Sequence, residues 1–162
     1  MFELKTSAAP SKPVLYAQLA EQSKALIGNE RDPIANAANL AALIWHTLPD
    51  LNWAGFYLFD GKELVLGPFQ GKPACIRIAL GKGVCGTAAQ QGKTVIVRDV
   101  HEFPGHIACD PASNSEIVVP LINDGKLLGV LDLDSPKRAR FDAEDAAGLE
   151  RLATIWASSR SL

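Results

Sequence analysis

Residues 115–134 constrain the fold more than any other part of the chain, because they form two apolar segments around a tight turn. Segments 115–122 and 126–134 are rich in Val, Ile and Leu, and Asn123-Asp124-Gly125 lies between them. Asn or Asp followed by Gly between two apolar runs is typical of a β-hairpin. We therefore predict two antiparallel strands here.

A second hairpin and two short strands complete the predicted sheet. Asp60-Gly61 separates a strand over 51–59 from a returning strand that starts at Glu63. Further strands are predicted over 74–80 and 94–97. Strands joined by such short turns run antiparallel. The sequence thus predicts a mainly antiparallel central sheet of about six strands.

Apolar residues at helical spacing predict helices at both ends of the chain. One helix is expected over 13–27, and another begins after Asp32, an N-cap residue followed by Pro33 at the first helical position. A last helix follows Asp142 and ends near residue 158. The buried stripe of the second helix is predicted to contain Ile34, Ala37, Ala41, Ile44 and Leu48.

These elements predict an α+β fold in one domain over residues 13–162, with N- and C-terminal helices flanking the sheet. Residues 1–12 are small and polar with two prolines, and are expected to form a flexible arm. Residues 98–115 have no helical or strand period and are expected to form a long lid loop. Aperiodic segments of this length inside a domain are usually functional or disordered. This one contains Cys109, a candidate reactive thiol, and the histidines His101 and His106.

Charge and cysteine usage exclude several classes of protein. Sixteen basic and eighteen acidic residues give a net charge of −2, and no basic stripe predicts nucleic-acid binding. No apolar run approaches the ~20 residues of a membrane span, and no signal peptide precedes the domain, so a cytoplasmic protein is expected. The three cysteines form no CxxC pair, and their spacing matches no compact zinc module. We therefore expect no disulfide framework, no metal site and no cofactor.

Gly81-x-Gly83-x-x-Gly86 matches a dinucleotide-binding fingerprint, with Asp99 at a compatible distance. The helix predicted after these glycines is short, and the surrounding hairpins do not form the parallel sheet of such sites. A tight turn into a helix explains the glycines better.

Three carboxylates are predicted to lie on one face of the sheet. Asp132 and Asp134 alternate with leucines along one strand, and Glu116 begins the strand paired with it. Such a group needs protons or a cation to offset its repulsion, and suits an ammonium ligand or a carboxylic acid that donates a proton. Trp53 and Tyr57 also share one strand face, where they pack in the core or form an aromatic wall beside these acids.

The sequence resembles the free methionine-(R)-sulfoxide reductases, which are GAF-domain enzymes. The resemblance covers roughly residues 14–157. It is carried by these motifs: Asn52-Trp53-Ala54-Gly55-Phe56-Tyr57, Gly71-Lys72-Pro73-Ala74-Cys75, Gly83-Val84-Cys85-Gly86-Thr87-Ala88, Phe103-Pro104-Gly105-His106-Ile107-Ala108-Cys109-Asp110 and Ser113-Asn114-Ser115-Glu116.

The resemblance implies a role for each cysteine. Cys109 would attack the sulfoxide and become a sulfenic acid, and Cys75 would condense with it to a disulfide that a thioredoxin-type reductant opens. Cys85 is expected to be an auxiliary thiol or part of the pocket wall, near a helix start that could lower its pKa.

The resemblance also implies a substrate site. Asp132 and Asp134 would bind the ammonium group or polarise the sulfoxide, and Glu116 or an aspartate would supply the proton. Trp53 and Tyr57 would pack the S-methyl group of the free methionine (R)-sulfoxide.

Two other classes compete with the reductase: a non-catalytic GAF sensor of a small ligand or of redox state, and, more distantly, a nucleotide-binding protein. Apolar surface expected on the terminal helices favours a homodimer.

Overall fold

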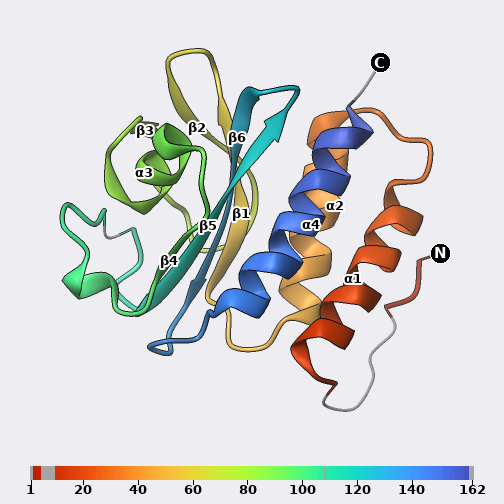
Figure 1. Ribbon diagram of the computed structural model, residues 1–162, viewed down its shortest axis with the longest axis horizontal. Helices are drawn as coiled ribbons and strands as arrows, with labels where there is room; N and C mark the ends of the chain where they lie inside the picture. The colour runs from red at the N-terminus through yellow and green to blue at the C-terminus, as the bar shows by residue number, and fades with distance from the viewer. Residues whose placement is uncertain (1, 5–9, 108, 161–162) are drawn as a thin grey trace.

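The structure is a computed structural model that describes residues 2–4, 10–107 and 109–160 (Figure 1). Its elements follow the chain as α1 (Lys12–Ile27), α2 (Pro33–Thr47), β1 (Trp53–Phe59), β2 (Glu63–Gly71), β3 (Arg77–Ala79), α3 (Gly83–Gln91), β4 (Val95–Val97), the 3-10 helix η1 (Val100–Glu102), β5 (Ser115–Asn123), β6 (Lys126–Ser135) and α4 (Ala143–Ser159). Half of the predicted arm over residues 1–12 lies outside the described residues, and Lys12 already begins α1.

The six strands form one sheet in the order β3-β2-β1-β6-β5-β4. Every neighbouring pair is antiparallel. The predicted hairpins β1–β2 and β5–β6 are therefore confirmed, and so is the α+β fold. The β1–β6 pairing places two hairpins side by side at the centre of the sheet.

Helices cover one face of this sheet, and a smaller layer covers the other. In Figure 1, α1, α2 and α4 lie on one side, whereas α3 and the segment between β4 and β5 lie on the other. Alternation along β1 sends Phe56 into the helical core, where it packs against Trp156, and sends Trp53 and Tyr57 into the second core. The second layer therefore encloses the face that carries the candidate site residues.

The two terminal helices are joined by a buried polar group at the start of α4. Asp142 and Asp145 form a capping box, as the predicted N-cap at Asp142 requires. Asp145, 1% exposed, accepts hydrogen bonds from Tyr16 Oη at 2.7 Å and Lys12 Nζ at 2.6 Å, and forms an ion pair with Arg140 at 3.2 Å. This carboxylate holds α1 against α4.

Two predicted details are wrong. Ile34 was expected in the buried stripe of α2 but is 48% exposed. In the first turns of this helix Asn36 is buried instead, and its Nδ2 donates to Ser159 Oγ at 3.1 Å. The strand expected over 74–80 pairs only at Arg77–Ala79, so Cys75 precedes β3. None of the described helices is long and apolar enough to cross a membrane.

Candidate active site

Strand pairing aligns the candidate residues in rows across the second face of the sheet. Asp134 of β6 lies opposite Trp53 on β1 and Glu116 on β5. In the neighbouring row, Asp132 lies opposite Gly55. Directly paired residues point to the same face, so the register brings the three carboxyl groups together beside Trp53.

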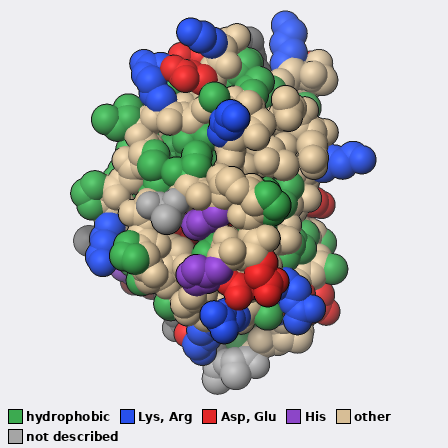
Figure 2. All heavy atoms as spheres, turned by 90° about the vertical axis from the view of Figure 1, so that its left-hand side faces the viewer, with side chains coloured by type: hydrophobic (Ala, Val, Ile, Leu, Met, Phe, Trp, Pro, Cys, Tyr) green, Lys and Arg blue, Asp and Glu red, His purple; other side chains and the backbone are tan. Residues whose placement is uncertain are grey.

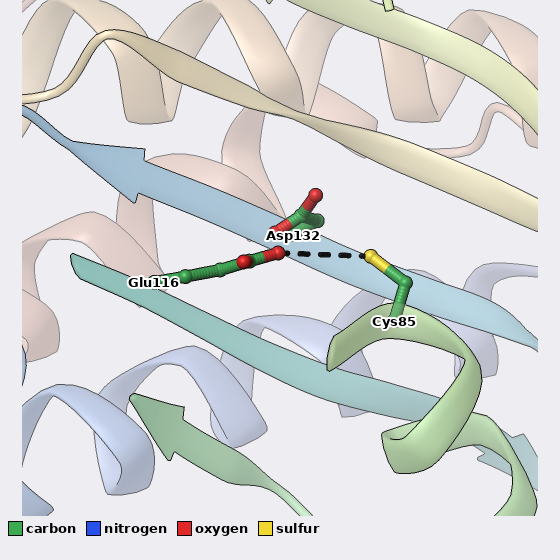
Figure 3. Close-up of side chains that lie close together, drawn as sticks. All are labelled: Cys85, Glu116 and Asp132. Atoms are coloured by element: carbon green, nitrogen blue, oxygen red, sulfur yellow. Dashed lines mark hydrogen bonds between the residues drawn. The ribbon is translucent and has the colours of Figure 1, made fainter. Parts of the chain in front are cut away.

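Cys85, Glu116 and Asp132 form a buried thiol–carboxyl cluster, drawn in Figure 3. Cys85 comes from α3, Glu116 from β5 and Asp132 from β6, and one ligand atom from each lies within 4.8 Å of the others. The Cys85 thiol donates to Glu116 Oε1 at 3.9 Å. A buried carboxyl oxygen on each of Asp132 and Asp134, Oδ1, has no hydrogen-bond partner among the described residues.

Burial favours the protonated form of these carboxyl groups. Loss of hydration raises the pKa of Glu116, Asp132 and Asp134 well above ordinary carboxyl values, and a neighbouring carboxylate raises each pKa further. A hydrogen bond from protonated Asp132 acts in the opposite direction on Glu116, because it favours the charged form of Glu116. The cluster can therefore retain a proton above the pH at which an exposed carboxyl group loses it.

The expectation that a helix start lowers the pKa of Cys85 is wrong. Cys85 lies in the first turn of α3, but burial raises its thiol pKa, and Asp132 and Glu116 raise it further. Desolvation and two adjacent acids outweigh the helix terminus. Cys85 is thus a protonated thiol in the wall of the site.

Trp53 and Tyr57 form an aromatic wall beside the acids. Their rings are stacked with centroids 5.8 Å apart. Trp53 Nε1 donates to the Lys72 carbonyl at 3.1 Å, and Tyr57 Oη donates to the Cys75 carbonyl at 2.9 Å. The wall therefore fixes the segment that carries Cys75.

Cys109 lies beside Cys75 at the exposed edge of the site. All three cysteines are free thiols, with Cys109 exposed and Cys75 half-buried. The side chain and backbone of Cys75 are within hydrogen-bonding reach of the Cys109 thiol. Partial burial and this neighbouring thiol raise the pKa of Cys109 to about 12. The two thiols are therefore neighbours at the edge of the site.

A polar clamp that the sequence analysis missed holds the loop after Cys109. Asn52 Nδ2 donates to Asp110 Oδ2 at 3.1 Å and to Ser113 Oγ at 2.9 Å. The Asn52 backbone N–H donates to the Asp134 carbonyl at 3.0 Å. Asn52 begins one of the motifs that carry the family resemblance, but nothing in the sequence predicts its contact with Asp110, 58 residues away.

The two loop histidines have different environments. His101 Nδ1 lies 2.7 Å from Asp99 Oδ1 at the start of the loop and away from the acids. His106 Nε2 lies 3.5 Å from Glu116 Oε2, and burial lowers the pKa of His106. Only His106 belongs to the site.

One pocket unites these groups under the loop. Its lining contains Trp53, Tyr57, Cys85, His106, Cys109, Glu116, Asp132 and Asp134, together with Lys72, Lys82 and residues 73–74. Cys75 is the one predicted site residue outside this lining, and its backbone carbonyl accepts the hydrogen bond from Tyr57 Oη. Figure 2 views the molecule from the left of Figure 1, the side of α3 and the β4–β5 segment, and shows histidine side chains at the surface beside acidic and basic ones.

A curled antiparallel sheet with an enclosed pocket on one face is the architecture of a GAF domain, and the GAF domain family matches residues 35–158. The free methionine-R-sulfoxide reductase of Escherichia coli is 51% identical over 142 residues, 88% of this chain and 86% of that protein. The Saccharomyces cerevisiae enzyme of the same name is 48% identical and matches 90% of this chain and 85% of that protein.

A solved structure points to the same relatives. The free methionine-R-sulfoxide reductase from Neisseria meningitidis, in complex with its substrate, superposes with a TM-score of 0.94 at 47% identity, over 99% of this chain and 96% of that one. This chain belongs to the free methionine-R-sulfoxide reductase family.

Proposed function

We propose that this chain reduces free L-methionine (R)-S-oxide to L-methionine, with Cys109 as the nucleophile. The observation that carries the proposal is the pairing of an exposed thiol, Cys109, with a second thiol, Cys75, at the edge of a pocket lined by protonated acids and an aromatic wall. Family membership supports it, because relatives that match most of the chain carry that enzyme's name.

In the first step, Cys109 Sγ attacks the sulfoxide sulfur. A carboxylic acid of the cluster, Glu116 or an aspartate, donates a proton to the sulfoxide oxygen, and the proton released by Cys109 returns to that carboxylate. The attack forms an Sγ–S bond, and the protonated S–O bond breaks as hydroxide leaves. Hydroxide then attacks Cys109 Sγ, and the Sγ–S bond breaks with its electron pair on the substrate sulfur. Methionine leaves, reduced by two electrons, and Cys109 becomes a sulfenic acid. The raised carboxyl pKa values favour this route, since burial makes an acid of the cluster retain its proton to higher pH than an exposed carboxyl group does.

In the second step, the Cys75 thiol attacks the Cys109 sulfenic acid. A Cys75–Cys109 disulfide forms and water leaves, so that one sulfoxide and two thiols yield methionine, water and a disulfide. The short approach between the two side chains supports Cys75 as the resolving thiol over the buried Cys85. A thioredoxin-type dithiol would then restore both cysteines.

The pocket supports recognition of a free amino acid. Asp132 and Asp134 would hold the substrate ammonium, since each has a buried Oδ1 with no hydrogen-bond partner among the described residues. Trp53 and Tyr57 would pack the S-methyl group and exclude the S epimer.

The decisive assay follows both epimers of free methionine sulfoxide. Reduced protein with dithiothreitol should consume only the R epimer. Cys109→Ser should release no methionine even in one turnover, whereas Cys75→Ser should release one equivalent and then fail to cycle with thioredoxin. Binding without consumption would instead identify a GAF sensor. Release of methionine by Cys109→Ser would move the nucleophile to Cys85.

Homodimer formation and a cytoplasmic location stay predictions. Sedimentation of the full chain tests the first. The second agrees with the chemistry, because a reducing compartment is needed to return the disulfide to thiols.

A further inference from the structure

We propose that Cys85, Glu116 and Asp132 bind a thiophilic divalent cation, for which zinc(II) is the probe. The three side chains converge from α3, β5 and β6 in Figure 3, with one ligand atom of each within 4.8 Å of the others. A thiolate and two carboxylates are recognised zinc ligands, and a fourth position is often completed by histidine or water.

One separation in the cluster is close to that of a tetrahedral site. Zinc bonds of about 2.3 Å to sulfur and 2.0 Å to oxygen at a tetrahedral angle separate the two ligand atoms by about 3.5 Å. Cys85 Sγ and Glu116 Oε1 are 3.9 Å apart. The Asp132 ligand atom lies within 4.8 Å of both.

A second observation points to a cation at this place. Asp132 is 5% exposed and lines the pocket, and its Oδ1 has no hydrogen-bond partner among the described residues. Within the described chain, neither Asp132 nor Glu116 forms an ion pair with Lys or Arg; His106 is the only basic side chain near Glu116, at 3.5 Å. Buried carboxylates in such surroundings need a proton or a cation.

The donor set determines which cation fits. Mg²⁺ and Ca²⁺ prefer oxygen ligands, whereas sulfur selects softer ions such as Zn²⁺. His106 Nε2 lies 3.5 Å from the second carboxylate oxygen of Glu116 but does not join the group of ligand atoms within 4.8 Å of one another, so we assign the fourth position to water. Binding must displace the Cys85 proton and any carboxyl proton, so affinity should rise with pH.

A cation bound to Cys85, Glu116 and Asp132 would block the pocket. The cation would take the position at which the cluster meets a substrate ammonium or sulfoxide oxygen, so zinc should compete with methionine sulfoxide. This consequence rests on the proposed function, whereas cation binding itself does not.

The test measures zinc binding directly. Reduced wild-type protein is titrated with zinc(II) against a coloured zinc chelator at pH 6.5 and 7.5. One zinc per chain should bind, more tightly at pH 7.5. Cys85→Ala and Asp132→Asn should weaken binding by on the order of a hundredfold, with folding checked by circular dichroism. A double variant, Cys75→Ser with Cys109→Ser, serves as the matched control and should keep the site.

Cobalt(II) gives an independent readout in unmutated protein. Its thiolate absorption should correspond to one Co–S bond and should persist in the double variant. Loss of the band there would assign the metal to the Cys75–Cys109 pair and overturn the proposal, as would failure of the wild type to bind zinc. Reductase activity in the presence of a chelator is measured in parallel, so failure of the cation site and failure of the proposed function give different results.

Discussion

Replacement of Asp132 by asparagine should stabilise the protein above about pH 5 and flatten the dependence of its stability on pH. Asp132 is buried beside Glu116, and both burial and this neighbour raise its pKa well above the ordinary 3.8. Between 3.8 and the raised pKa, the folded chain holds a proton that the unfolded chain releases. The free energy of unfolding therefore falls as pH rises through this window.

The magnitude follows from the number of protons that unfolding releases. One such carboxyl lowers the free energy of unfolding by about 1.4 kcal/mol for each pH unit. Asparagine retains the shape of Asp132 and a donor for Glu116, but does not titrate. Asp132→Asn should thus reduce the slope by up to about 1.4 kcal/mol per pH unit, and gain up to about 3 kcal/mol between pH 5.5 and 7.5.

Urea unfolding at pH 5.5, 6.5 and 7.5 measures this difference, provided that the dependence on urea is the same in both proteins. Asp124→Asn, in the exposed turn between β5 and β6, is the matched control and should follow the wild-type slope. Parallel curves for Asp132→Asn and the wild type would refute the reasoning. A variant that is less stable at every pH would show that the ionised carboxylate makes a structural contact.

Three further outcomes are expected. Iodoacetamide should modify Cys109 first, at a rate that rises about tenfold per pH unit up to the Cys109 pKa of about 12. Mass spectrometry should find Cys85 modified only after the protein unfolds; early modification of Cys85 would contradict its burial. Tyr57→Phe removes the hydrogen bond to the Cys75 carbonyl and should lower the free energy of unfolding, measured in urea, by about 1 kcal/mol. It should also slow formation of the Cys75–Cys109 disulfide in stopped-flow experiments; an unchanged rate would show that Tyr57 does not position the segment that carries Cys75. Gly148→Ala places a methyl group against the Tyr16 ring, and should lower stability by roughly 1–3 kcal/mol; a neutral effect in thermal unfolding would show that α1 shifts freely against α4.

The pairing of β5 with β6 could be predicted from the sequence, because the turn at 123–125 marks the hairpin and Asp132 and Asp134 alternate with leucines. The exact register could not. The pairs beside the turn, such as Ile122 with Leu127, would by themselves bring Leu133 opposite Glu116. An irregularity between Leu121 and Ile122 shifts the register by one residue and brings Asp134 opposite Glu116, and no sequence pattern marks that irregularity.

The surroundings that set the pKa of each side chain, and the contacts between loops far apart in the sequence, could not be predicted from such patterns. The first turn of α3 suggested an acidic thiol at Cys85, but the pKa depends on burial and on acids from two other elements. The approach of Cys75 to Cys109 depends on two segments without strand or helix pattern. Cysteine spacing alone likewise gave no hint that Cys85 lies beside Glu116 and Asp132.

The hydrogen bonds from the aromatic wall to the segment before β3 couple the shape of the pocket to the position of Cys75. Trp53 and Tyr57 shape the apolar side of the pocket, and the same two side chains anchor the carbonyls of Lys72 and Cys75. A substitution that enlarges the pocket also releases the segment carrying Cys75. Variants selected for bulkier ligands should therefore need compensating changes in residues 72–75, and these positions should co-vary with the wall.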